Sequence, residues 1–124
     1  MTKSYNIAII EYMRRRREYL GQLELMVLLA VTSLDGKAYG VEISKCIEEA
    51  SGREVALASV YVALERLERK GFITSSLGEP MPERGGRART YFKPTSSGLK
   101  EARAACNTLS RLSGRLASWK GTFA

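Results

Sequence analysis

The chain has 124 residues, with 20 lysines and arginines against 13 aspartates and glutamates, and its net charge is +7 at pH 7. This length allows one domain with a modest core, and a dimer interface would help to bury the remaining apolar surface. The positive charge favours an anionic partner, although most basic proteins of this size simply carry solvated cations.

The composition does not favour an enzyme. The chain has no histidine, so it lacks the imidazole base of many catalytic sites and the commonest metal ligand. It has no phosphate-binding glycine loop of the P-loop or dinucleotide type. Its two cysteines, Cys46 and Cys106, are in no metal-like spacing and fall on the apolar sides of expected helices. We therefore expect no cofactor and no metal, and we interpret both cysteines as reduced core residues of a cytoplasmic protein.

Residues 1–19 are expected to form a helical extension, with a short helix over residues 5–18 that ends in the arginine run 14–17. This run could touch phosphates, but we favour a solvated helix end because short charge runs usually have no partner. A twin-arginine export signal is not expected, since the apolar run that follows is too short and no small-residue cleavage site comes after it. No stretch approaches the roughly 20 apolar residues of a membrane span. We expect a soluble protein with no membrane partner.

Apolar periodicity predicts three helices, over residues 22–34, 39–51 and 57–70. The first is apolar nearly all round, which indicates burial on both sides, and in so small a chain burial between subunits is the favoured explanation. Leu23 and Val27 of this helix are therefore candidate dimer contacts. The second and third helices, joined by a short connection that begins at Gly52, form a helix-turn-helix candidate.

A β-hairpin is predicted next, with strands over residues 72–77 and 88–93 and a turn rich in glycine and proline between them. The second strand places Arg87, Arg89, Tyr91 and Lys93 at alternate positions, so these side chains should share one face. From Arg84 to Lys93 there are four cations and no anion. Such a hairpin suits a polyphosphate backbone, and duplex DNA is the obvious partner of that kind.

A long helix is predicted over residues 96–118, and at roughly 34 Å it is longer than a cap on so small a domain needs to be. Its apolar side is expected to meet a partner subunit. The residues of that side are Leu99, Ala102, Cys106, Leu109, Leu112 and Leu116. The expected fold is mainly α with a small β-hairpin wing (α+β): a winged helix-turn-helix domain over residues 20–95, followed by a dimerisation helix and tail over residues 96–124.

Several motifs in order and spacing resemble the PadR family of bacterial transcriptional regulators over residues 20–103. They are Leu23-Glu24-Leu25, Tyr39-Gly40-Val41-Glu42-Ile43, Ser59-Val60-Tyr61, Leu64-Glu65-Arg66-Leu67-Glu68-Arg69-Lys70-Gly71, Gly85-Gly86-Arg87 and Tyr91-Phe92. The chain departs from the pattern at Val62, where many members have proline, and it lacks the usual Ser or Thr cap near Ala56. The resemblance implies a homodimeric regulator, usually a repressor, that binds an inverted-repeat operator.

The helix predicted over residues 57–70 carries the expected base-reading residues. Small groups on its exposed face can enter the major groove, so we expect Ser59 and Val62 to read bases, with Tyr61 and Arg66 on flanking phosphates. The alternative is that Val62 is incidental and that this face carries only an ordinary solvent-exposed pair of Glu65 and Arg69.

The hairpin is expected to supply contacts to the DNA backbone through Arg84, Arg87, Arg89 and Lys93, with Arg87 at the tip suited to a minor groove. The alternative is a charged, flexible hairpin that its arginines keep soluble.

The main rival function is a winged-helix module that binds another protein through the same helix and wing, without specific DNA binding. A small-molecule effector is a weaker expectation. Some members of the family stack planar drugs on an aromatic residue of the last helix, but Trp119 lies near the end of this chain, where an anchor on a partner subunit is favoured.

Overall fold

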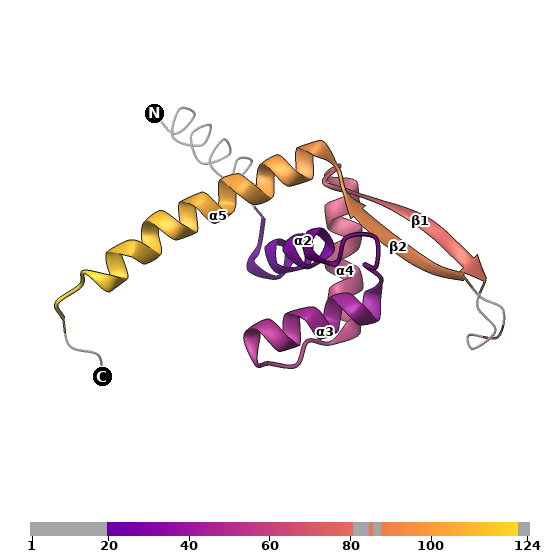
Figure 1. Cartoon of the computed structure of the whole chain (residues 1–124), viewed down its shortest axis with the longest axis horizontal. Coiled ribbons are helices and arrows are strands. Elements are labelled where there is room, and N and C mark those ends of the chain that lie inside the picture. The colour runs from indigo at the N-terminus through magenta and orange to yellow at the C-terminus, as the bar shows by residue number, and fades with distance from the viewer. Residues whose placement is uncertain (1–19, 81–84, 86–87, 122–124) are drawn as a thin grey trace, which may run out of the picture.

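The computed structural model describes residues 20–80, 85 and 88–121. Its elements are α2 (Gln22–Leu34), α3 (Gly40–Ser51), α4 (Leu57–Arg69), β1 (Ile73–Pro80), β2 (Ala88–Pro94) and α5 (Ser96–Ala117). Three helices form a small body, the hairpin projects from one side of it, and α5 leaves as a long rod toward the other side (Figure 1). The predicted fold class, a winged helix-turn-helix with a long final helix, is confirmed. The predicted extension over residues 1–19, including the arginine run 14–17, lies outside the described residues.

One hydrophobic core holds the body together. The helix α4 supplies four buried residues at helical spacing, as predicted, and α3 supplies Ile43 and Ile47. The largest side chains that are completely buried are Leu28, Ile43, Leu64, Leu67, Ile73, Val27, Val31 and Val60. Burial of each such side chain stabilises the fold by about 2 kcal/mol relative to leaving it in water.

The explanation favoured for α2 was wrong in part, because most of its apolar surface is covered by the chain itself. Val27, Leu28, Ala30 and Val31 lie in the protomer's own core, and Leu29 is 36% exposed. Apolar periodicity does not distinguish a helix that is covered by its own chain from one that is covered by a second subunit.

Both cysteines are free thiols, as expected, but neither is a core residue. Cys46 and Cys106 are half-buried. Cys46 lies at the edge of the core with its Sγ 3.7 Å from the hydroxyl of Ser33, whereas Cys106 lies on α5 and is not among the residues that pack against the core.

The connections follow the predicted turns. Gly52 ends α3 in the left-handed conformation, with φ 71°, and its N–H donates to the carbonyl of Glu48 at 2.8 Å. Glycine is the residue that adopts this conformation at least cost, so the helix stops here and α4 can start five residues later.

The two strands pair antiparallel, and the hairpin is longer than predicted. Ile73 pairs with Pro94 at its base, and β1 runs to Pro80 because an irregularity between Leu77 and Pro80 lets the strand continue past the last regular pair. Ile73 and Phe92 are buried in the core. The N–H of Phe92 donates to the carbonyl of Ala38 at 2.8 Å, which joins the hairpin to the segment that leads into α3.

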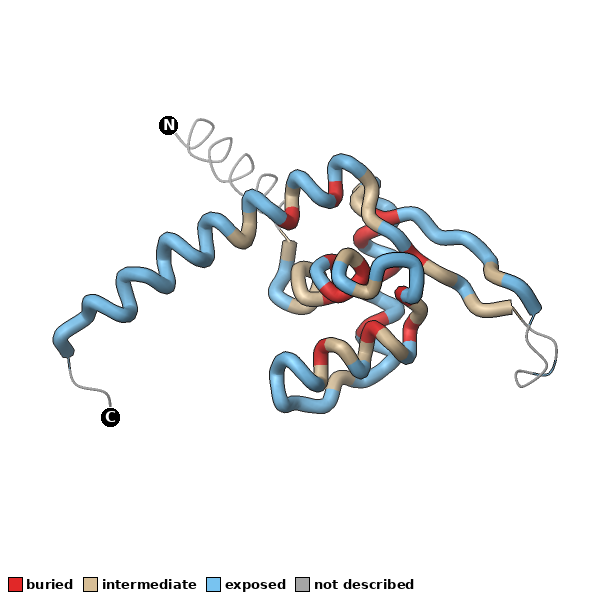
Figure 2. The backbone as a smooth tube through the Cα atoms, in the orientation of Figure 1, coloured by how far each residue is buried: buried red, intermediate tan, exposed pale blue. Residues whose placement is uncertain are grey.

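The start of α5 is fixed against the body. Thr95 caps the helix by accepting from the N–H of Gly98 at 3.0 Å and donates its own hydroxyl to the carbonyl of Gly71 at 2.7 Å. A Cβ at Gly98 would overlap the carbonyl oxygen of Phe72, so glycine lets the helix approach that closely. Beyond Cys106 every described residue of α5 is exposed, and the rod projects into solvent (Figure 2).

Candidate nucleic-acid interface

The helix α4 presents a broad exposed face opposite its buried residues. Tyr61 and Val62 are each 48% exposed, although both are largely apolar, and Ser59 and Arg66 are exposed beside them. The N-cap of α4 is Ala56, and no side chain caps the helix there. The absence of the usual Ser or Thr cap, noted in the sequence, therefore leaves the first turn of this helix without a side-chain acceptor.

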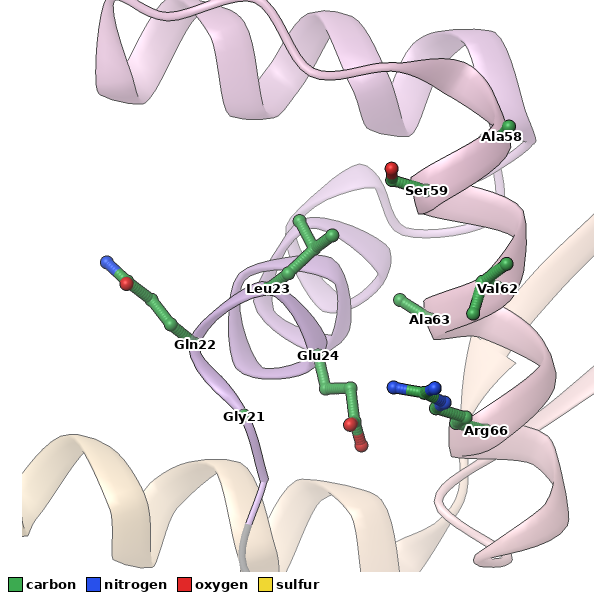
Figure 3. Close-up of a pocket in the computed structure, with 9 residues that line it drawn as sticks. All are labelled: Gly21, Gln22, Leu23, Glu24, Ala58, Ser59, Val62, Ala63 and Arg66. Carbon is green, nitrogen blue, oxygen red and sulfur yellow. The ribbon is translucent and has the colours of Figure 1, made fainter.

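Three of the predicted DNA-binding residues line one groove. Ser59, Val62 and Arg66 lie on the side of α4 that faces the start of α2, and the groove between them has a volume of about 500 Å³ (Figure 3). The opposite wall is formed by residues 21–24, and the side chains of Leu23 and Glu24 project toward the groove. Sequence reasoning placed the three residues on one helix face but did not find the second wall.

The carboxylate on this wall has a cationic partner. Lys70, the C-cap of α4, donates to Glu24 with its Nζ 2.6 Å from Oε1, and the two side chains are only 27% and 12% exposed. This ion pair joins the start of α2 to the end of α4. It also offsets a negative charge that would otherwise repel phosphates beside the groove.

The exposed face of α4 also carries the ion pair of Glu65 and Arg69, which the sequence offered as the alternative to DNA contact. Arg69 donates to Glu65 at 2.7 Å, and both side chains are about 70% exposed. An exposed pair of this kind contributes about 0.3 to 0.5 kcal/mol to the helix.

Tyr61 points to a different side of α4, toward α3. A Cβ at Gly40, the first residue of α3, would overlap the hydroxyl of Tyr61. The glycine of the Tyr39-Gly40 motif therefore makes room for this ring. Tyr61 as a whole stays about half exposed, although its hydroxyl end lies against α3.

The wing joins the body through aromatic contacts of β2. The guanidinium carbon of Arg89 lies 4.2 Å from the centre of the Tyr39 ring. The Tyr91 ring meets the Tyr39 ring edge to face, with centroids 5.6 Å apart and planes at 79°. Arg89 and Tyr91 therefore share a face, as predicted, but that face turns toward Tyr39 at the N-cap of α3. Lys93 is exposed, and Arg84 and Arg87 lie outside the described residues.

The residues predicted for dimerisation divide into two groups. Val27 and Ala102 are buried in the protomer's own core, so in this conformation they are not available to a partner, and Leu23 and Cys106 are half-buried. The other four form an uncovered stripe on α5, in which the exposed fractions are 41%, 53%, 56% and 60% for Leu99, Leu109, Leu112 and Leu116. Trp119 follows just beyond the helix and is 50% exposed.

Two chemical features are absent from the part of the chain that the structure describes. No three His, Cys, Asp or Glu residues gather there in a way that would hold a metal ion. Among the described helices, none has the length and apolar character needed to cross a membrane.

The architecture and these motifs match known proteins. A model of the "Transcriptional regulator PadR-like family" matches residues 28–104. An uncharacterized 37.1 kDa protein in transposon TN4556 of Streptomyces fradiae is 33% identical over 93 residues, which are 75% of this chain but only 24% of that protein. The chain thus spans about a quarter of the length of this relative.

Solved structures show the same architecture. A transcriptional regulator from Clostridium thermocellum is 26% identical, with a TM-score of 0.64 over 80% of this chain and 90% of that one. A PadR family transcription regulator from Clostridium difficile is 22% identical, with a TM-score of 0.67 over 82% of this chain and the whole of that one. Because the family model covers well over half of the residues, the chain belongs to the PadR-like family of transcriptional regulators.

Proposed function

We propose that this protein is a homodimeric, sequence-specific repressor that binds an inverted-repeat operator. The observation that carries the proposal is the placement of the exposed face of α4 beside a basic hairpin, on a body whose last helix carries an uncovered stripe of leucines. Such a protein would act on DNA in the cytoplasm.

The helix α4 is the proposed reader of the operator. Ser59 can donate to base edges or accept from them, and the methyl groups of Val62 can contact thymine methyls in the major groove. Tyr61 and Arg66 would hold phosphates on either side, because they flank these two residues on the helix surface. Val62 is half exposed, which supports this role, because removing an apolar side chain from water at an interface lowers the free energy of the complex.

The wing is proposed to contact the DNA backbone through Lys93, which is exposed, and through Arg84 and Arg87, which lie outside the described residues and which the sequence assigns to the turn of the hairpin. These contacts carry no sequence information but fix the register of the protein on the duplex.

The rod α5 is proposed to be the dimerisation helix. An isolated helix rarely keeps four leucines on one side in water, and the α5 stripe is not covered by the described part of its own chain. A second copy can cover it symmetrically, with the same stripe on both subunits. The two α4 helices would then address two half-sites of an inverted repeat.

A titration of labelled DNA from upstream of the protein's own gene tests this function. We expect saturable binding that survives excess non-specific competitor and weakens steeply as salt is raised. Binding of equal, weak affinity to every duplex would contradict sequence-specific regulation and would favour a winged-helix module that binds a protein partner.

A further inference from the structure

The contacts between the wing and α3 form a continuous row of side chains. Arg89 lies over the Tyr39 ring, and Tyr91 meets the same ring edge to face. Tyr91 also covers Gly78 on the neighbouring strand, where a Cβ would overlap its ring. The row therefore crosses both strands of the wing and ends on Tyr39, which occupies the N-cap position of α3.

A hydrogen bond of Tyr39 strengthens the contact between the Arg89 guanidinium and the Tyr39 ring. The hydroxyl of Tyr39 donates to a carboxylate oxygen of Glu42 at 3.2 Å. A hydrogen bond to a carboxylate raises the electron density of the phenol ring, and a richer ring attracts a guanidinium above its face more strongly. Arg89 is half-buried, so this attraction acts in a partly desolvated site.

Tyr39 is joined directly to the residue that supports the reading helix. Gly40 follows Tyr39 in the chain and lies against the hydroxyl end of the Tyr61 ring on α4. The two residues Tyr39 and Gly40 thus contact the wing on one side and α4 on the other. A two-stranded hairpin is marginally stable by itself, and its direction depends on such anchors.

We propose that Arg89 is a positioning residue that fixes the angle between the wing and α4 through Tyr39, and that it is not a phosphate ligand. This inference rests on the proposed function, in which the wing and α4 contact one duplex together. It replaces the role expected for Arg89 from the sequence, where it was grouped with the other wing cations.

Four variants of the full chain test the proposal on the operator fragment: Arg89→Met, Tyr39→Leu, the double variant, and Arg111→Met as a control arginine outside the leucine stripe of α5. We expect each of the first two to weaken operator binding by roughly threefold to thirtyfold, the range of a partly buried cation–π contact. The double variant should bind more strongly than the product of the two single effects predicts, because the contact between Arg89 and Tyr39 is lost in either single variant. Arg111→Met should bind as the parent does.

Two further readouts separate positioning from direct contact and from a general loss of stability. Hydroxyl-radical footprints of Arg89→Met and Tyr39→Leu should lose the same protection at the wing flank and keep the protection at α4. Because both variants release the wing, the slope of log affinity against log salt should flatten to the same extent in Arg89→Met and in Tyr39→Leu. A slope that flattens in Arg89→Met but not in Tyr39→Leu would identify a phosphate contact of Arg89 itself and overturn the proposal.

Conservative variants and the unfolding equilibrium complete the test. Tyr39→Phe keeps the ring and Arg89→Lys keeps the cation, so both should retain most of the wing protection. Urea unfolding of the parent, Arg89→Met, Tyr39→Leu and the double variant should show that the two changes are not additive. Strict additivity would overturn the proposed contact between Arg89 and Tyr39. If the parent chain bound no promoter fragment, the proposed regulatory function would be wrong. The urea-unfolding comparison would still show whether Arg89 and Tyr39 interact.

Discussion

The ring of Tyr61 on α4 lies against Gly40 at the start of α3, so closely that a Cβ at position 40 would overlap its hydroxyl. We expect Gly40→Ala to destabilise the fold by about 0.5 to 1.5 kcal/mol, because the half-exposed Tyr61 ring has to leave its present rotamer. Urea unfolding measures the change.

Gly114→Ala is the matched control, since nothing lies near a Cβ at this position in α5. It should not destabilise the protein, because alanine favours an exposed helix over glycine by about 0.5 to 1 kcal/mol. Adding Tyr61→Ala to Gly40→Ala should recover part of the loss from overpacking. Equal effects at positions 40 and 114 would contradict the packing.

Val62 is predicted to face bases in the major groove. Val62→Asp should abolish operator binding, because the carboxylate would be repelled by the phosphates and could not contact a thymine methyl. The side chain is 48% exposed, so the substitution should leave the fold and the dimer intact. Anisotropy titration measures binding, and thermal unfolding and gel filtration provide the control. Unaffected binding would remove Val62 from the groove.

The salt dependence of binding counts phosphate contacts. Lys93→Ala and Arg66→Ala should each lower the slope of log affinity against log salt by about one unit and weaken binding to all sequences alike. Arg111→Ala should leave the slope unchanged. If Lys93→Ala behaved like the control, the wing would not touch the backbone at its base.

The leucine stripe on α5 is predicted to hold the dimer. Leu112→Asp places a charge among exposed leucines and should shift the protein toward monomers, because a charge buried between two helices without a partner costs several kcal/mol. Sedimentation velocity measures the shift. Asn107→Asp, an exposed change elsewhere on the helix, is the control and should leave the dimer intact. A parent chain that sediments as a stable monomer would contradict this role of α5.

The helix bounds could be predicted closely from the sequence, because the residues that α4 buries recur at helical spacing and Gly52 marks where α3 ends. The far end of β1 could not, because the irregularity after Leu77 has no pattern of its own.

Long-range contacts limited the prediction of the site. The alternation on β2 placed Arg89 and Tyr91 on one face, but Tyr39, about fifty residues away, decides where that face points. Val27 and Ala102 failed as interface candidates for a similar reason. An apolar helix face looks the same in sequence whether the chain itself or a second copy covers it.

The most direct test of the central claim is a footprint of the purified parent chain on DNA from upstream of its own gene. We predict two protected half-sites related by an inverted repeat, with their centres about one helical turn or a multiple of it apart. No protection at low ionic strength, or protection that follows no sequence, would contradict the account.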